Sequence, residues 1–345
     1  MVLLWLLLAL PAAAWPQGWK ELRTVEADPK VISAKLGIPL QSVQNAFLEV
    51  EGQPLQVNTI RCTSSQDAVK LQTRLGQPQR IFARESTVIE LVCKDAYLLQ
   101  QAIYALELKP RKQSYRVTFR AAGLQECAPM AWNRMFNACR TNDRKTVDEL
   151  SSAFKFSRQL VLRNPKAEVE PAEPRFGFPE FTVAVNVDSE AFGLTPGTAG
   201  KTGATPFWPA DDPELKKLAA EAVGSQKDKV RALLSHVHQN MRYGGVTGSR
   251  WGVKKFLQQK TGQCWDYSDL FITLCRSQGI PARQVMGWMV PGGGHVWAEV
   301  WTGSGWLAVD PTAGALAGSD LVPLFTSEDG KVPVLYTSSV NVVNR

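Results

Sequence analysis

The stretch from 262 to 312 constrains the fold most, because a helix-like periodicity gives way to strand-like periodicities within it. A helix-patterned segment begins near Cys264 and ends at the breaker Gly279-Ile280-Pro281. Leu270, Phe271 and Leu274 share the face of this helix that we expect to be buried. Strand-patterned segments follow at 282–290, 295–301 and 306–310.

The last two strand-patterned segments predict a hairpin. The residues 302–305, Thr-Gly-Ser-Gly, are a turn signal between them. If Trp301 pairs with Trp306, His295 and Asp310 lie on one face of the sheet as diagonal neighbours. A register slip of one residue would move Asp310 to the other face, so this arrangement requires an even-numbered loop.

Cys264, His295 and Asp310 form a candidate nucleophilic site. A thiolate attacks, an imidazole carries the proton, and a carboxylate orients the imidazole. We expect Cys264 to lie at a helix N-terminus, where the helix dipole and unpaired N–H groups favour an anion. The Cys264 amide is also available there to a developing oxyanion. The whole chain has only three histidines, so one placed in this way is unexpected by chance.

Four sequence blocks resemble the transglutaminase-like superfamily, which includes transglutaminases, peptide N-glycanases and bacterial thiol hydrolases. The blocks run over 262–266, 279–287, 295–300 and 305–312. The resemblance covers about residues 210–315 and implies a papain-like α+β fold. It also implies that Cys264 is the nucleophile, His295 the base and Asp310 the residue that orients the base.

The resemblance leaves the second oxyanion donor open. Gln263, Tyr243 and Trp251 are the candidates, and Trp265 and Trp297 are candidates for the substrate pocket. Ordinary packing is the alternative role for each of these side chains. We expect no metal, because no Cys-x-x-Cys pair, histidine cluster or acidic calcium loop occurs, and we expect no cofactor.

The pattern upstream of the site predicts three further segments. Residues 15–150 are expected to form a small α/β domain, in which residues 20–50 mix helix and turn. Within it, a strand at 87–93 precedes a helix capped by Asp95. Residues 130–140 are expected to form a short helix. Residues 151–209 are rich in Pro, Gly and Thr and predict a connector with some β structure, in which 154–163 and 181–187 are the expected strands. The catalytic domain is then expected over residues 210–345.

Residues 1–14 predict an export signal. The apolar run is too short to span a bilayer, and Ala12 and Ala14 fit the small-residue rule for cleavage. No Lys or Arg precedes the run, so an uncleaved anchor or a misassigned start is the alternative. Cleavage near Trp15 would place the protein outside the cytoplasm, in the periplasm or secreted.

The six cysteines divide between the two halves of the chain. In an exported protein we expect disulfides, and local pairing favours Cys62–Cys93 and Cys127–Cys139. Cys275 lies about three helical turns beyond Cys264, too far for a disulfide, and is expected to be a buried core residue.

The net charge of +7 bears on the partners. A basic surface could favour anionic cell-wall polymers or peripheral contact with lipid headgroups, although a merely solvated surface is the simpler interpretation. No nucleic-acid-binding motif accompanies the charge, so no nucleic-acid partner is expected.

The leading functional hypothesis is an exported thiol enzyme that acts on protein or peptide amides through an acyl-thioester. Water as the second nucleophile makes it a protease or amidase, which we favour, and an amine makes it a cross-linking protein-glutamine gamma-glutamyltransferase. A non-catalytic binding or scaffold protein that retains the fold is the alternative from another class. An arylamine acetyltransferase uses the same three residue types but fits an exported chain poorly.

Overall fold

The computed structural model describes residues 15–126 and 129–345. The predicted export signal at 1–14 and the predicted partner Cys127 lie outside these residues. The chain divides into two compact units between Lys109 and Pro110. This division lies well before the boundary predicted at 150, because the strand that begins at Lys112 pairs with strands of the second unit.

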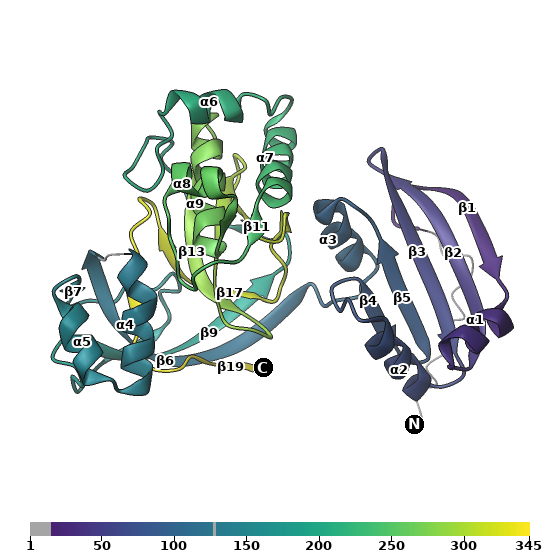
Figure 1. The fold of residues 1–345 in the computed structure, drawn as a ribbon, viewed down its shortest axis with the longest axis horizontal. Coiled ribbons are helices and arrows are strands. Elements are labelled where there is room, and N and C mark those ends of the chain that lie inside the picture. Colours follow the sequence, from purple (N-terminus) through teal and green to yellow (C-terminus); the bar gives the residue numbers. More distant parts are fainter. Residues whose placement is uncertain (1–14, 127–128) are drawn as a thin grey trace. The chain divides into compact units, whose positions relative to one another are not determined.

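The first unit is a five-stranded antiparallel sheet of order β1-β2-β3-β5-β4 with three helices (Figure 1). Its elements are β1 (Trp19–Ala27), α1 (Pro29–Leu36), β2 (Leu40–Val50), β3 (Gln53–Cys62), α2 (Ser65–Leu75), β4 (Ile81–Arg84), β5 (Thr87–Val92) and α3 (Ala96–Ala105). The prediction of mixed helix and turn over 20–50 was wrong, since two long strands occupy most of that stretch. Ala46, Leu48 and Val50 are buried at alternate positions of β2, which is the period of a strand.

The predicted passage from strand to helix at 87–106 is confirmed. Asp95 caps α3, because its carboxylate accepts the backbone N–H groups of Tyr97 and Leu98. The helix then buries a broad apolar face that includes Leu98 and Ile103.

The predicted Cys62–Cys93 disulfide was wrong. β3 and β5 are antiparallel, so Cys62 lies beside Ser86 at one end of the pair and Cys93 lies near Pro54 at the other. About seven residues of extended strand separate the two sulfurs, which is roughly 20 Å. A disulfide needs Cα atoms within about 7 Å.

The second unit begins with a long strand, a helical insertion and a second sheet. These elements are β6 (Lys112–Glu126), α4 (Pro129–Thr141), α5 (Arg144–Ser151), β7 (Lys155–Ser157), β8 (Glu168–Ala172), β9 (Glu180–Glu190) and β10 (Leu194–Thr195). The helix predicted over 130–140 and the strand predicted over 181–187 are confirmed as α4 and β9. A predicted strand over 154–163 is reduced to the three residues of β7.

The rest of the second unit carries the helices around the predicted nucleophile. Its elements are α6 (Pro213–Ala219), α7 (Gln226–Asn240), β11 (Arg242–Tyr243), α8 (Val253–Gln259), β12 (Thr261–Gly262), α9 (Cys264–Ser277), β13 (Ala282–Met289), β14 (Gly294–Trp301), β15 (Trp306–Asp310), β16 (Ala315–Leu316), β17 (Leu321–Ser327), β18 (Val334–Tyr336) and β19 (Asn341–Asn344). No described helix is both long and apolar enough to cross a membrane.

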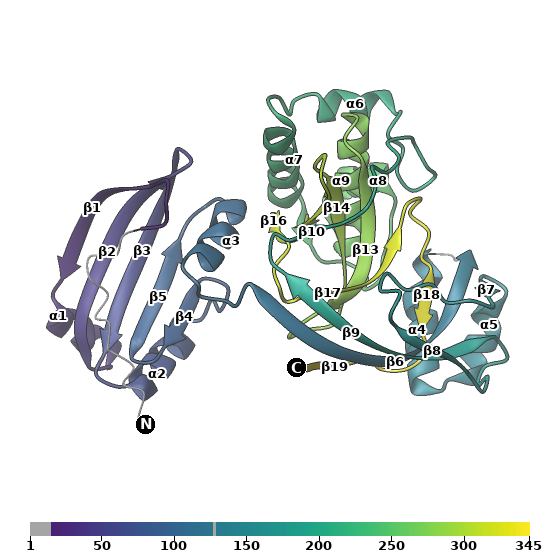
Figure 2. The same ribbon diagram turned by 180° about the vertical axis from the view of Figure 1, so that it is seen from behind.

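Two six-stranded sheets organise this unit. In one, β6 pairs with β9 along most of its length and also with β7, β18 and β19 (Figure 2). In the other, the order is β10-β15-β14-β13-β17, and α9 packs against β13 and β14. The mixture of helices and strands confirms the predicted α+β class.

Helix α9 is the buried centre of the unit. Leu270, Phe271 and Leu274 are fully buried on it, as the periodicity predicted, and Cys275 is a buried core residue. Helices α6, α7 and α8 pack against it from the side away from the sheet (Figure 1). The helix is therefore fixed on all sides, and its first residue is held in one place.

Candidate active site

Cys264 is the first residue of α9. The short strand β12 lies directly before the helix and pairs in parallel with β11, which fixes the position of the helix start. The side chain is buried, with only 8% of the residue exposed. As the first helical residue, Cys264 has a backbone N–H without an acceptor in its own helix, so the helix start presents donors beside the sulfur.

The predicted hairpin register is confirmed. Trp301 pairs with Trp306, and Glu299 pairs with Ala308. His295 and Asp310 consequently share a face, and His295 Nε2 lies 2.8 Å from Asp310 Oδ2. The second carboxylate oxygen of Asp310 accepts the backbone N–H groups of Thr312 at 2.9 Å and Ala313 at 3.3 Å.

Burial opposes charge on both His295 and Asp310, but each group stabilises the charge of the other. Burial lowers the pKa of the His295 ring, while the Asp310 carboxylate raises it and prevails, so this pKa lies well above its ordinary value. Negative charge on Cys264 acts in the same direction. Burial raises the pKa of Asp310, while the imidazolium and the two backbone donors outweigh it, so this pKa is lowered. The pair therefore carries opposite charges at neutral pH.

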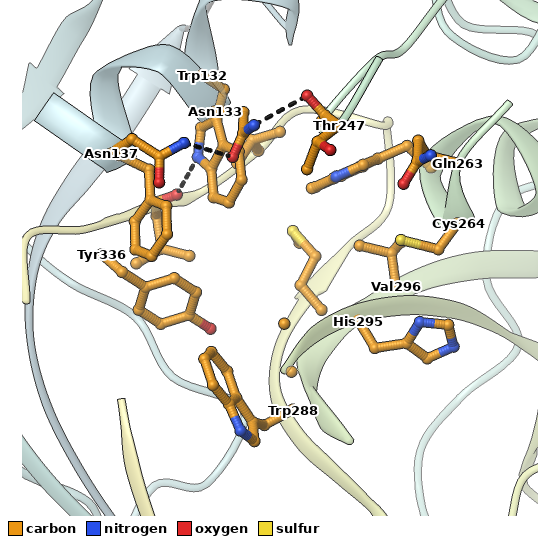
Figure 3. Close-up of a pocket in the computed structure, with 18 of the residues that line it drawn as sticks. Trp132, Asn133, Asn137, Thr247, Gln263, Cys264, Trp288, His295, Val296 and Tyr336 are labelled. Carbon is orange, nitrogen blue, oxygen red and sulfur yellow. Dashed lines mark hydrogen bonds between the residues drawn. The ribbon is translucent and has the colours of Figure 1, made fainter. Parts of the chain in front are cut away.

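The thiol of Cys264 faces the same imidazole ring. Figure 3 shows Cys264 beside His295 at the edge of a pocket, and a side-chain hydrogen bond between them contributes to the raised pKa of His295. Because Nε2 is occupied by Asp310, Nδ1 is the ring nitrogen left for the sulfur. The three predicted residues thus meet in the order thiol, imidazole, carboxylate.

A second buried carboxylate fixes the start of α9. Asp266 accepts the backbone N–H groups of Gln263 at 3.0 Å and Trp251 at 2.7 Å, together with the Ser249 hydroxyl at 3.3 Å. Burial raises the pKa of Asp266 to about 6, against the effect of these donors. Asp266 therefore ties the loop before α8 to the turn that carries Cys264.

The pocket beside Cys264 has a volume of about 320 Å³ (Figure 3). One side of it comes from α4, which supplies Trp132, Asn133, Phe136 and Asn137. The Asn133 side chain donates to the carbonyl of Thr247 at 2.9 Å, so α4 is joined to the loop before Cys264.

This side of the pocket was not predicted from the sequence, because the residues of α4 were expected to belong to a separate domain over 15–150. Trp132 and Phe136 are four residues apart, as are Asn133 and Asn137, so each pair lies on one helix face. That spacing was the available signal, although it is equally typical of a helix packed in a core.

The structure separates the three candidate oxyanion donors. Gln263 and Tyr243 line the pocket, whereas Trp251 does not, and that prediction needs correction. The Trp251 ring lies under the Lys255 ammonium at 4.4 Å from its centroid. Gln263 already donates from its side-chain nitrogen to the Gly244 carbonyl at 2.9 Å.

Tyr243 is the remaining donor with a side chain at the pocket. It is 55% exposed, and burial of its hydroxyl together with charge on Cys264 and Asp310 raises its pKa to about 12. The hydroxyl therefore stays protonated, as a donor must.

The two candidate pocket residues also separate. Trp265 lines the pocket, and its ring lies edge-on to Trp132 and under the Arg250 guanidinium. Trp297 does not line it, and this prediction needs correction. It is 1% exposed and stacks on the His295 ring, with centroids 6.0 Å apart. Its position supports the imidazole.

No cluster of three or more His, Cys, Asp or Glu side chains able to hold a metal occurs among the residues that the structure describes. His238, one of the two other histidines, bonds from Nδ1 to the Thr312 carbonyl at 2.9 Å and lies outside the pocket.

Comparison with known proteins places the site within a family. A family model described as the Transglutaminase-like superfamily matches residues 216–311. An uncharacterized protein of Mycobacterium leprae is 37% identical over 79 residues, which is 20% of this chain and 28% of the relative. An uncharacterized protein of Mycobacterium tuberculosis is 30% identical over 137 residues, which is 33% of this chain and 44% of the relative. The chain thus spans less than half the length of these relatives.

Solved structures resemble the chain more weakly. A protein of Cytophaga hutchinsonii, provisionally described as a cysteine protease, matches at 17% identity and a TM-score of 0.39, covering 68% of this chain and 89% of that one. The periplasmic domain of TgpA from Pseudomonas aeruginosa matches at 17% identity and a TM-score of 0.29, covering 60% and 89%. The family match carries the identification: residues 216–311 are a transglutaminase-like domain.

Proposed function

We propose that this domain is a thiol enzyme that cleaves protein or peptide amides through an acyl-thioester on Cys264. The observation that carries the proposal is the position of His295, which holds Asp310 at 2.8 Å through one ring nitrogen and faces Cys264 with the other. A scaffold protein has no need of a buried, oppositely charged pair beside a thiol, since burying charge costs free energy.

In the acylation step, the Cys264 sulfur attacks the amide carbonyl as a thiolate and forms a tetrahedral intermediate. The imidazolium of His295 then gives its proton to the leaving nitrogen, the C–N bond breaks, and a thioester remains. Asp310 keeps the ring oriented and stabilises its positive charge throughout.

The negative charge on the tetrahedral oxygen needs donors. We assign one to the backbone N–H of Cys264, at the positive end of α9. The second is the Tyr243 hydroxyl, which lines the pocket and remains protonated. Gln263 would have to give up its bond to the Gly244 carbonyl to serve in the same way.

In the second step, His295 accepts a proton from the incoming nucleophile as it attacks the thioester. The C–S bond then breaks, and Cys264 leaves as the thiolate beside the imidazolium. We favour water as that nucleophile. An amine acceptor would need its own binding surface next to Cys264, and water needs none. Hydrolysis makes the protein a protease or amidase.

Incubation of purified protein with casein and a labelled primary amine, followed by mass spectrometry, tests the reaction class. Cleaved or deamidated casein without label supports hydrolysis. Incorporated label means amine transfer and contradicts our choice of nucleophile. No change in casein beyond that with Cys264→Ala would support the scaffold alternative.

We further infer that the protein acts outside the cytoplasm on an extracellular or cell-wall-associated protein. The apolar residues 1–10 followed by Ala12 and Ala14 support this inference. N-terminal sequencing of the protein recovered from a host cell should find a start near Trp15, and an intact Met1 would contradict export.

A further inference from the structure

The pocket continues from Cys264 towards four aromatic rings, those of Trp132, Phe136, Trp288 and Tyr336, which we call the aromatic wall. Trp132 and Phe136 are stacked with their centroids 5.7 Å apart. Tyr336 lies edge-on to Phe136 at 6.3 Å and to Trp288 at 6.4 Å. The rings support one another, so the wall exists before any substrate arrives.

One polar atom of this wall has no partner. The hydroxyl of Tyr336 is buried and makes no hydrogen bond to any described residue, although Tyr336 is only 5% exposed. Figure 3 shows the hydroxyl directed into the pocket beside Trp288. Buried polar groups are normally hydrogen-bonded, so an orphaned hydroxyl aimed into a cavity indicates that an occupant supplies the partner.

The size and polarity of the pocket restrict that occupant. Its volume of about 320 Å³ is roughly twice the 150 Å³ of an apolar cavity that accepts benzene, so a substituted aromatic ring fits. None of the described lining residues is Asp, Glu, Lys or Arg. A cationic side chain would lose its hydration here without gaining a counter-ion, and the charge of His295 is already paired with Asp310, so the pocket favours a neutral side chain.

The wall also has a fixed relation to the reaction. Cys264, His295, Trp265 and Trp288 line the same pocket, so a group bound there lies next to the carbonyl that the sulfur attacks.

We propose that the aromatic wall forms the acyl-side specificity pocket and selects a neutral aromatic side chain that carries a hydrogen-bonding group, with tyrosine as the simplest example. This proposal rests on the proposed thioester chemistry. The phenol of the substrate bonds to the Tyr336 hydroxyl, its ring packs against Trp288, and the polar rim formed by Asn133 and Asn137 faces the peptide.

The test measures acylation of Cys264 in the full chain by p-nitrophenyl esters of N-acetyl-tyrosine, N-acetyl-phenylalanine, N-acetyl-alanine and N-acetyl-lysine. Nitrophenolate release in the first turnover and the mass of the acyl-enzyme are the readouts. These activated esters report acylation whether water or an amine resolves the thioester. We expect the tyrosine ester to acylate Cys264 about 5- to 150-fold faster than the phenylalanine ester. The phenol of the tyrosine ester gives the buried Tyr336 hydroxyl a hydrogen-bond partner, whereas the phenylalanine ester leaves it without one.

The variant Tyr336→Phe removes the hydroxyl and keeps the ring. It should bring the rate with the tyrosine ester down to that with the phenylalanine ester, and leave the latter unchanged. Tyr115→Phe is the matched control, because Tyr115 is a buried tyrosine outside the pocket that bonds to the Ser319 carbonyl. It should keep the wild-type preference for the tyrosine ester.

The outcomes separate the two proposals. If no ester acylates Cys264, the proposed thioester chemistry fails. If acylation occurs but the alanine or lysine ester matches the tyrosine ester, or if Tyr336→Phe keeps the preference for tyrosine, the chemistry stands and the specificity pocket is overturned.

Discussion

The two sides of the pocket are built on different principles. The side formed by Cys264 and His295, with Asp310 bonded to His295, is called the catalytic wall and is held by directional hydrogen bonds and opposite charges. The aromatic wall is held by ring packing, and among the described residues the only side-chain hydrogen bond made by its four rings runs from Trp132 to the Val334 carbonyl.

This difference determines how each side tolerates change. A directional array fails when one member is lost, because the remaining groups keep their charge and lose their orientation. Removing one ring from a packed group removes only the contacts of that ring, and the cost depends on the side chain that fills the pocket. Damage to the catalytic wall should therefore affect every substrate, and damage to the aromatic wall should affect only those with large side chains.

The largest effect is expected for Asp310→Asn. An amide cannot hold the imidazolium charge and favours the wrong ring tautomer, so kcat/KM for every ester should fall by about 10⁴-fold. Asp188→Asn, which alters an exposed carboxylate on β9, is the control and should leave the rate unchanged. A loss below tenfold would mean that His295 does not depend on Asp310.

Trp288→Ala should give the next largest effect. Opening the aromatic wall should lower acylation by the tyrosine ester about 10- to 100-fold, since a half-buried indole contributes on the order of 1.5–3 kcal/mol of packing. The alanine ester and iodoacetamide should react as before. Equal losses for all esters would show that Trp288 supports the catalytic wall instead. Trp19→Ala in the first unit is the control.

The pH profile provides a third comparison. His295 must remain protonated to give a proton to the leaving nitrogen. The Asp310 carboxylate keeps the pKa of the His295 ring well above its ordinary value. In Asp310→Asn, burial becomes the main influence on the His295 ring and lowers its pKa. The alkaline limb of the residual kcat/KM should therefore move to lower pH, whereas Trp288→Ala should leave the limb in place. An unmoved limb in Asp310→Asn would assign it to another group.

The smallest effect is expected for Asn133→Ala. This change removes the bond from α4 to the Thr247 carbonyl, which contributes about 1 kcal/mol, so KM for the tyrosine ester should rise about fivefold. The kcat value should not change, because Cys264 is positioned by Asp266 and not by α4. Asn240→Ala, which removes a comparable side-chain bond to the His236 carbonyl on α7, outside the pocket, serves as the control. A fall in kcat without a rise in KM would contradict this assignment.

The catalytic wall was predictable because its residues obey local rules. The alternation from His295 to Trp301, the turn after it and the return from Trp306 fix a register, and the register places Asp310. The breaker at 279–281 likewise marks the end of α9, which puts Cys264 at the other end of a buried helix.

The aromatic wall was not predictable, because no local rule links its members. Trp132, Trp288 and Tyr336 lie on α4, β13 and β18, and their meeting depends on how two sheets and a helix pack. The predicted Cys62–Cys93 disulfide was wrong for a related reason. Two cysteines that are close in sequence can lie at opposite ends of a pair of antiparallel strands, as these two do. The boundary predicted at 150 likewise divided β6 and α4 from the unit to which they belong.

Strand β6 has a practical consequence for anyone who shortens this protein. The C-terminal strands β18 and β19 find their antiparallel ladders on β6, which begins at Lys112. A truncated gene product starting at 151 or 210 would leave those ladders open, and open ladders recruit other molecules into aggregates. Recombinant fragments that retain residues from 110 onward are therefore the ones to express.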